Sequence, residues 1–311
     1  MLHDLHVTRA PCGTGGAGPK KYSAQDGELL ILLLGHFAWF SHTHAREIIE
    51  FGGHTSIVEW LTTKRFKGQA NALDDALAFP LHRACLSTLA SICRHGIDTS
   101  NHVLELDGIE LALQFATHLE AGVRCCALRL LARLIPYAAK RHPQKDSLPL
   151  DSLWPIILVE LRSNDELLRT VAGACALEAI ANGCVPVENG NSTIPQSLAL
   201  ALLNALELAA AADSSTAALP LLIAVHRMAG DEDELIHSAM RKNESLIPLM
   251  TDWLPKATRP MAVATAKAAG LSAACTLRLL RISAASGAQF RPEPYLYRFR
   301  IVPLSLSPHL R

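Results

Sequence analysis

Glycines and lysines near the amino terminus have the composition of a phosphate-binding loop. The stretch from Gly13 to Lys21 contains four glycines followed by two lysines. A phosphate loop needs a preceding strand, a lysine directly after its last glycine, and then a serine or threonine. Here Pro19 follows Gly18, and no serine or threonine follows Lys21. We therefore predict a flexible Gly-rich arm over residues 1–24 and no bound nucleotide.

Histidines gather most densely over the next stretch of the chain. His36, His42, His44 and His54 lie within 19 residues of one another. A zinc site needs three or four ligands that converge at about 2.0 to 2.3 Å, usually from spacings such as HxxxH or CxxC. On a helix, His42 and His44 point in different directions. We expect surface or capping histidines and no metal site.

Carboxylates at Asp231, Glu232, Asp233 and Glu234 could in principle hold a cation. A calcium loop alternates its ligands around a central glycine, and four consecutive carboxylates lack that spacing. Acidic residues also favour the first turn of a helix, where they complement the helix dipole. We expect this cluster to begin a helix and to bind no ion.

Cysteines recur on or beside the segments that we interpret as long helices. We place Cys126, Cys175 and Cys275 at one repeated position, where a small apolar residue fits between packed helices. A nucleophile would not be needed three times, so these are predicted to be reduced core thiols. The sequence also lacks the Gly-x-Ser-x-Gly, HExxH and paired CxxC motifs. We expect no catalytic residues, no cofactor and no enzyme activity.

The elements that position these residues are clearest between Val103 and Leu134. We predict a short helix ending at Leu106, a second helix over 109–118 and a longer third helix over 123–135. Glycine adopts a positive φ readily, so Asp107-Gly108 is expected to break the chain after the first helix. Gly122 is expected to separate the second helix from the third. A third helix that is apolar nearly all round must lie between neighbours of its own kind.

Copies of the third helix lie on both sides of it. The apolar-Ala step at its centre falls at Ala90, Ala132, Ala181 and Ala229, which are 42, 49 and 48 residues apart. A helical period in the forties is typical of armadillo or HEAT arrays.

The break between the first and second helices is also repeated. Ile48–Gly53 followed by Ile57–Leu61 matches Val103–Gly108 followed by the 125–134 helix. On these residues the sequence resembles the armadillo-repeat family, over roughly residues 25–285. The resemblance implies units of a short first helix, a glycine break, a second helix and a longer third helix.

The fold expected from the repeats and the resemblance is all-α. It is a right-handed α-solenoid of about four to five armadillo-like repeats over residues 25–285, with an irregular tail over 286–311 that contains several prolines, arginines and aromatic residues. Residues 64–73 interrupt the period and are predicted to form a loop on one face.

The most apolar run, Leu29–Phe40, is 12 residues long, whereas a membrane span needs about 20. We interpret it as the last helix of an incomplete first repeat. An apolar outer face there would be unusual, because terminal repeats normally present a polar side, and it would invite a partner or an upstream segment.

Charge and targeting signals narrow the range of partners. Lys plus Arg and Asp plus Glu both number 29, so no net charge draws the chain to nucleic acid or to an anionic membrane. No apolar segment begins near Met1, so no secretory signal is expected. We expect a protein partner, no nucleic acid and no membrane, and a cytoplasmic or nuclear rather than secreted chain.

The armadillo resemblance implies that the third helices line a binding groove. In the importin-like branch that groove carries a ladder of Trp and Asn. The matching pairs here lack both residues, and they are Ala84 and Thr88, Cys126 and Leu130, Cys175 and Ala179, Ile223 and Arg227. Binding of nuclear-import signals is therefore not expected.

A polar position recurs along the third helices and gives the candidate groove residues. They are Ser87, Arg129, Glu178, His226 and Arg278. The alternative interpretation of this row is an ordinary solvated helix face. Arg129 and Arg278 are the preferred candidates, because arginine is enriched at binding hot spots.

The function expected from these features is that of a non-catalytic scaffold or adaptor, which binds an extended peptide or a helix of another protein along the inner face of the solenoid. Two alternatives stay open. One is a segment or subunit of a larger solenoid assembly, and the other is an enzyme with an unrecognised loop site.

Overall fold

A computed structural model of the chain describes residues 24–62, 72–141, 152–184, 187–188, 191–192, 196–212, 220–221 and 223–225. Most of the predicted arm, most of the 64–73 interruption, the acidic cluster at 231–234 and the 286–311 tail lie outside these residues.

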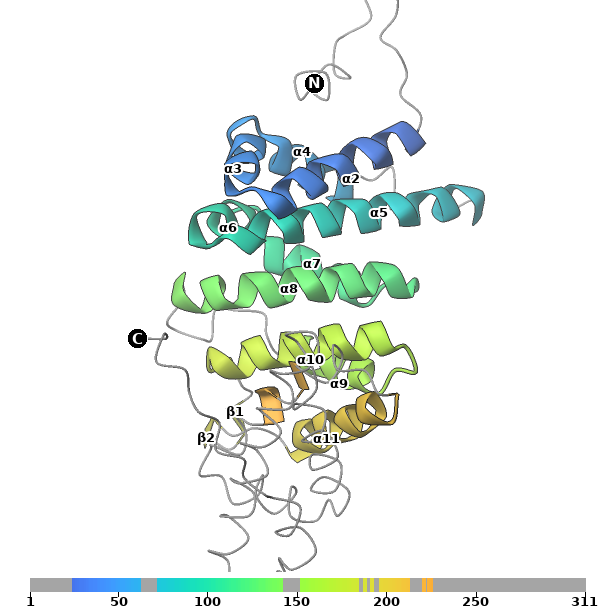
Figure 1. Ribbon diagram of the computed structural model, residues 1–311, viewed down its shortest axis with the longest axis vertical. Helices are drawn as coiled ribbons and strands as arrows, with labels where there is room; N and C mark the ends of the chain where they lie inside the picture. The colour runs from blue at the N-terminus through green and yellow to red at the C-terminus, as the bar shows by residue number, and fades with distance from the viewer. Residues whose placement is uncertain are drawn as a thin grey trace, which may run out of the picture.

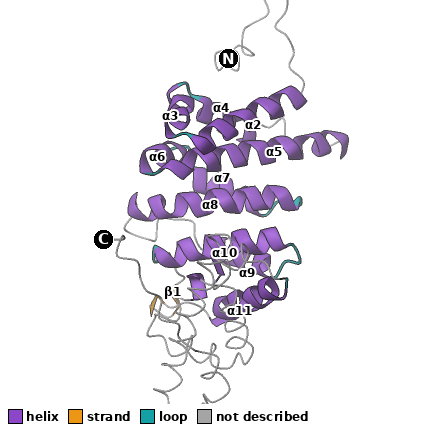
Figure 2. Cartoon of the chain, in the orientation of Figure 1, coloured by secondary structure: helices purple, strands orange, loops and turns teal. Residues whose placement is uncertain are grey.

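Helices make up nearly all of the described chain (Figure 2). Their bounds are α2 Ala24–Phe40, α3 His42–Glu50, α4 Gly53–Thr62, α5 Ala72–Ile92, α6 Ile97–Leu104, α7 Gly108–Ala116, α8 Ala121–Arg141, α9 Leu153–Leu161, α10 Glu166–Ala181 and α11 Gln196–Ala211. A single 3-10 turn, Cys93–His95, joins α5 to α6.

The predicted unit of three helices occurs twice in succession. α3, α4 and α5 form one unit, and α6, α7 and α8 form the next. In each unit the first two helices are short and the third is 21 residues long. The armadillo-like order of helices is thereby confirmed for this part of the chain.

The break between the first and second helices differs from the prediction in one detail. In the first unit Gly52 adopts a φ of 72°, and in the second unit the equivalent residue is Asp107, with a φ of 54°. Aspartate is one of the few side chains that tolerate this left-handed region. Gly108 is needed for space, because a Cβ atom there would lie 2.6 Å from the carbonyl oxygen of Val103.

The third helix of the second unit is longer than predicted. Gly122 is the second residue of α8 and does not separate α7 from it, and α8 continues through Pro136 to Arg141. Ile135 and Ala138, on either side of that proline, are 1% exposed. Burial of this face outweighs the backbone hydrogen bond that proline removes.

The long helices form the spine of the solenoid. α2 packs on α5, α5 on α8 and α8 on α10, and Figure 1 shows these four helices as successive rungs. The predicted role of Leu29–Phe40 as part of the last helix of an incomplete repeat is confirmed, because α2 lies on α5 as α5 lies on α8. One hydrophobic core runs continuously from Ile31 to Val225. The described elements therefore form the predicted all-α solenoid.

α9 and α10 are the second and third helices of the following unit. Residues 163–166, Ser-Asn-Asp-Glu, have the spacing of a capping box that would begin α10 after Ser163, but the helix is capped two residues later. Asp165 is the N-cap, and its carboxylate accepts hydrogen bonds from the backbone N–H groups of Leu167 and Leu168. Ser163 instead accepts from Asp165 N at 3.1 Å.

The segment between α10 and α11 contains a short hairpin. β1, Val187–Glu188, pairs antiparallel with β2, Asn191–Ser192. α11 follows it and packs on α9 and α10.

Candidate functional site

The solvent-exposed sides of α5, α8 and α10 hold those predicted site residues that the structure describes. We call this surface the third-helix face. Ser87 lies on α5, Arg129 on α8 and Glu178 on α10, and each is half-buried. His226 and Arg278 lie outside the described residues.

Ser87 and Arg129 occupy equivalent positions on neighbouring helices. A shift of 42 residues carries the buried positions of α5 onto buried positions of α8. The pairs are Leu81 and Val123, Cys85 and Ala127, Leu86 and Leu128, Leu89 and Leu131, Ile92 and Leu134. These buried pairs put Ser87 and Arg129 at equivalent positions of α5 and α8, and a role of either residue in binding stays a prediction.

Glu178 was aligned with Arg129 by a shift of 49 residues, and the structure contradicts that alignment. A shift of 45 residues superimposes the buried positions of α8 and α10. The pairs are Val123 and Leu168, Ala127 and Ala172, Leu128 and Gly173, Leu130 and Cys175, Leu131 and Ala176, Leu134 and Ala179. Ala174 is therefore the equivalent of Arg129, and Glu178 lies one helical turn further along.

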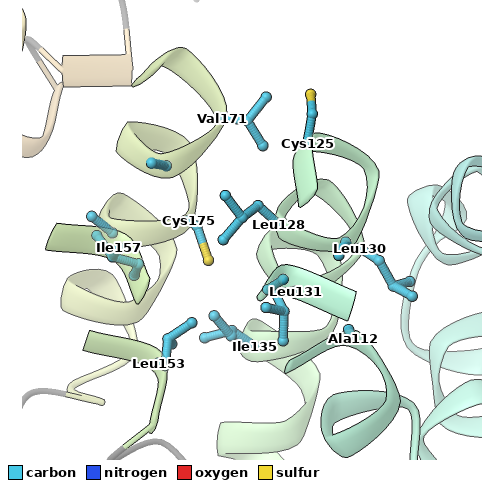
Figure 3. Packing of buried hydrophobic residues seen from close by; sticks show 14 of the residues in the cluster. Ala112, Cys125, Leu128, Leu130, Leu131, Ile135, Leu153, Ile157, Val171 and Cys175 are labelled. Atoms are coloured by element: carbon cyan, nitrogen blue, oxygen red, sulfur yellow. The ribbon is translucent and has the colours of Figure 1, made fainter. Parts of the chain in front are cut away.

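The same correction applies to the repeated cysteine position. Cys175 is fully buried, and Figure 3 shows its side chain pointing from α10 toward Leu128 of α8. Cys126 is half-buried. The two cysteines are thus one turn apart in repeat register, and Cys275 lies outside the described residues.

Paired arginines at the start of the third helices support the 45-residue register. Arg124 is the fourth residue of α8 and donates from Nη1 to the carbonyl oxygen of His118. Arg169 is the fourth residue of α10 and donates from Nη1 to the carbonyl oxygen of Ser163. Both arginines satisfy a backbone carbonyl six residues earlier in the turn before their helix.

Arg124 also forms a buried ion pair that links two units. Its Nε lies 2.7 Å from Oε1 of Glu160 on α9, and the Glu160 side chain is only 6% exposed. A buried carboxylate requires such a partner. Arg124 therefore links the first turn of α8 to α9, and its guanidinium group is not available to bind a ligand.

The positions of the importin-like ladder face other helices. Thr88 is 1% exposed and its hydroxyl donates to the carbonyl oxygen of Ile31 on α2, at 2.8 Å. Leu130, at the equivalent position of α8, is fully buried. Neither Thr88 nor Leu130 is exposed to solvent, whereas Cys126, the other ladder position of α8, is half-buried.

Three arginines of the third-helix face form what we call the arginine patch. They are Arg83, Arg129 and Arg133. Arg83 and Arg133 are exposed and Arg129 is half-buried. Within the described residues no carboxylate oxygen lies within 4.0 Å of any of the three guanidinium groups. The patch is a local cluster of positive charge without an ionic partner in this part of the chain.

Two observations place Arg83 against α8. Its Cδ lies 3.0 Å from the position that a Cβ atom would take on Gly122. Burial raises the pKa of the Cys126 thiol, and both Arg129 and Arg83 act in the opposite direction. Arg83 was not among the predicted site residues, although its place one turn before Ser87 was a signal that could have found it.

Glu120, the acidic residue directly before α8, is already engaged in a hydrogen bond. The Glu120 carboxylate accepts a hydrogen bond from the backbone N–H of Val123 at 2.6 Å, at the first turn of the helix. This contact holds the charge of Glu120 at the helix N-terminus.

The buried thiols are poor nucleophiles. Burial raises the pKa of Cys85 and of Cys93 to about 12, and that of Cys125 to about 11. A thiolate is the reactive form, so these thiols are unreactive at neutral pH.

Neither a metal cluster nor a membrane-spanning helix is found in the described part of the chain. No group of three or more His, Cys, Asp or Glu side chains there is arranged to hold a metal ion. No described helix is both long enough and apolar enough to cross a bilayer. His54, for which a surface or capping position was predicted, is the second residue of α4 and is buried at 9% exposure.

Comparison with known proteins gives the fold. No protein-family model and no curated protein matches the sequence. An engineered protein matches with a TM-score of 0.62 at 13% identity, covering 89% of this chain and 97% of that chain. A computationally designed armadillo repeat protein for modular peptide recognition matches with a TM-score of 0.57 at 11% identity, over 89% and 97%. These likenesses show an armadillo-like fold.

One further solved structure is a complex. A designed armadillo repeat protein in complex with the peptide (KR)4 has a TM-score of 0.56 with this chain at 12% identity, covering 88% of this chain and 97% of that chain.

Proposed function

We propose that this chain is a non-catalytic scaffold that binds an extended acidic segment of another protein across α5 and α8. The observation that carries the proposal is the arginine patch of Arg83, Arg129 and Arg133. Its three guanidinium groups come from two adjacent helices and have no ionic partner in the described residues.

The chemistry of the patch favours carboxylates. A guanidinium group offers a planar fork of donors that matches a carboxylate with two parallel hydrogen bonds. Arg129 and Arg133 are one helical turn apart, about 6 Å along the axis of α8. Residues of an extended peptide are about 3.3 Å apart, so alternate side chains of a peptide can reach both arginines.

The armadillo-like fold supports a peptide as the ligand, since a designed protein with this fold was solved with the peptide (KR)4. The charge of the arginine patch on α5 and α8 has the same sign as that basic peptide. The arginine patch is therefore expected to repel (KR)4 and to attract a peptide of opposite charge.

The proposal of a non-catalytic protein rests on the thiols. Cys85, Cys93, Cys125, Cys126 and Cys175 are free thiols, and burial raises the pKa of each of them. Free buried thiols suit a reducing compartment, so we propose the cytosol or the nucleus as the location.

A fluorescence anisotropy titration with labelled (DE)4, (KR)4 and (GS)4 peptides tests the proposal. The intact chain should bind (DE)4 in preference to the other two, and more weakly at high salt. Arg83→Glu together with Arg129→Glu should weaken (DE)4 binding by about tenfold or more.

The matched control is Arg46→Glu together with Arg162→Glu. These exposed arginines lie on α3 and at the end of α9, so the control makes the same change in net charge away from the patch. Circular dichroism should show equal helix content in all variants. Equal loss of (DE)4 binding in both double variants would refute the patch assignment.

A further inference from the structure

An apolar face covers the outer side of α2. Its members are Leu29, Leu32, Leu33, Phe37 and Phe40, with exposures of 60, 43, 52, 51 and 72%, together with exposed His36. We call this set the α2 end face. Trp39 is not included, because the Arg94 guanidinium lies over its ring at 3.9 Å from the centroid.

The α2 end face is turned away from α5, and of its members Phe37 also contacts the ring of His44 on α3, with centroids 5.6 Å apart. The opposite side of α2 carries the buried residues Ile31, Gly35 and Ala38. The hydroxyl of Thr88 on α5 donates to Ile31 O and lies against Gly35. Leu29 and Leu33 are each two residues from Ile31, which is about 200° around the helix. The apolar face is thus turned away from α5, at the end of the row of long helices (Figure 1).

The size of this face marks it as an interaction surface. The five apolar side chains expose about 600 Å² in total, which is at the upper end of the largest patch on an ordinary monomer. Terminal repeats of a solenoid normally present a polar outer side. The α2 end face is apolar instead, so a partner is expected to cover it.

The spacing of the face is symmetric about the point between residues 34 and 35. An antiparallel copy of α2 placed across that point brings Leu29 opposite Phe40 and Leu33 near His36, and brings Leu32 to the same level along the helix axis as Phe37 on the other flank of the face. Each of these pairs combines one leucine with one ring. Such self-complementarity is what a two-fold interface between identical chains requires.

Charge and area agree with this pairing. No Asp, Glu, Lys or Arg occurs between Leu29 and Phe40, so no like charges meet across the axis. Antiparallel helices also bring opposite ends of their dipoles together. Complete burial of the face in both copies would remove about 1,200 Å² from solvent, against the roughly 1,000 Å² expected of a specific interface.

We propose that the α2 end face binds a second copy of this chain, through an antiparallel α2–α2 contact about a two-fold axis. The amino-terminal residues of the same chain are a poorer occupant. Residues 8–21 contain no Leu, Ile, Val, Met, Phe, Tyr or Trp, and the apolar residues among 1–7 are interspersed with His3, Asp4 and His6, so this segment offers less continuous apolar surface than a second α2.

The contact joins two solenoids end to end and leaves no further copy of the α2 end face free. A two-fold interface uses the same patch on both copies, so assembly stops at the dimer and forms no filament. Each dimer then carries two third-helix faces. A partner with two acidic segments would bind such a dimer more tightly than a single chain, because its second contact is intramolecular.

Sedimentation equilibrium of the full chain over a range of concentrations tests the proposal. The wild type should reach twice its 33.6 kDa mass. Leu29→Glu and Phe40→Lys, made singly, should each raise the dimer dissociation constant by about tenfold or more, because each buries one unpaired charge per copy. The two changes combined in one chain should restore the dimer, because every Glu at 29 would then face a Lys at 40 of the second copy.

Val159→Glu is the matched control, since Val159 is 66% exposed on α9 and lies outside the α2 end face. It should leave the mass unchanged, and circular dichroism should show that every variant is folded. A wild type that stays monomeric, or a dimer that is insensitive to Leu29→Glu, overturns the proposal. Failure of the double variant to recover overturns the antiparallel register.

Discussion

Cys175 and Cys126 show at the level of single residues how α10 is set against α8. Cys175 lies fully buried between these helices, whereas Cys126 is half-buried near Arg83 and Arg129. The two cysteines that the sequence repeat aligned therefore lie in different environments, one fully buried and one half-buried. Their substitution by a charged residue should have unequal costs.

Cys175→Asp should lower the free energy of unfolding by about 4 kcal/mol, because it places an unpaired carboxylate in a dry interface. Cys126→Asp should cost less than about 1.5 kcal/mol, because two guanidinium groups lie nearby and water can reach the site. Urea denaturation of both variants measures the difference. Equal losses would contradict the 45-residue register.

The burial of His54 was likewise not predicted from the sequence. It is buried on α4, with its ring centroid 5.7 Å from that of His102 and its Nδ1 without a hydrogen-bond partner in the described residues. Burial lowers the pKa of His54 below its ordinary value of 6.5. His102 lowers the pKa further, and Glu105 partly opposes both effects.

This pKa shift predicts a loss of stability in mild acid. Below pH 6.5 the unfolded chain takes up a proton at His54 that the folded chain resists, so the free energy of unfolding falls as the pH decreases. His54→Leu should flatten this part of the stability profile, whereas His44→Leu, at an exposed site, should not. Parallel profiles for the wild type and His54→Leu would argue against the shift.

At the level of helices, the sequence predicts elements better than it predicts register. The repeated break at Gly52-Gly53 and Asp107-Gly108, together with apolar spacing, was enough to predict the three-helix unit. The register of α10 was missed because Cys175 and Ala179 are small residues one turn apart. A pattern of small and apolar residues matches itself when shifted by a turn, and only contacts between helices decide which match is real.

The candidate site was predicted only in part for a similar reason. Arg129 could be found because its position repeats along the chain. Arg83 belongs to the patch because Gly122 leaves room for its side chain at the start of α8. The residues in that contact are about 40 positions apart in the sequence. A contact of this kind cannot be predicted from helical periodicity, which describes only neighbours along one helix.

The contact between α2 and α5 depends on a glycine. A Cβ atom on Gly35 would lie 2.5 Å from Oγ1 and 3.3 Å from Cα of Thr88, whose hydroxyl is fixed by its bond to Ile31. Gly35→Ala should therefore cost about 2 kcal/mol in unfolding free energy despite the better helix propensity of alanine.

Gly122→Ala is the comparison for Gly35→Ala. A Cβ atom there would meet only the flexible side chains of Arg83 and Glu120, at 3.0 Å. We expect no loss of stability from Gly122→Ala, or a gain of up to about 1 kcal/mol. Thermal denaturation of both variants checks the pair, and an unaffected Gly35→Ala would show that α2 is not held closely on α5.

At the scale of the whole molecule, the solenoid presents two surfaces of different chemistry. The third-helix face carries the arginine patch, and the α2 end face is apolar. An end-to-end dimer would leave both arginine patches on the surface, since the two sets share no residue. Partner binding and self-association can thus be separated by mutation.

Locating a bound acidic peptide tests the central claim most directly. A (DE)4 peptide with a benzophenone group at one end would be bound to the full chain and irradiated, and the cross-linked residues identified by mass spectrometry. We predict that cross-links fall within 79–94 and 121–141, the segments that carry the arginine patch and its surroundings on α5 and α8. Cross-links confined to α3, α4, α6, α7 or α9 would contradict binding at the third-helix face.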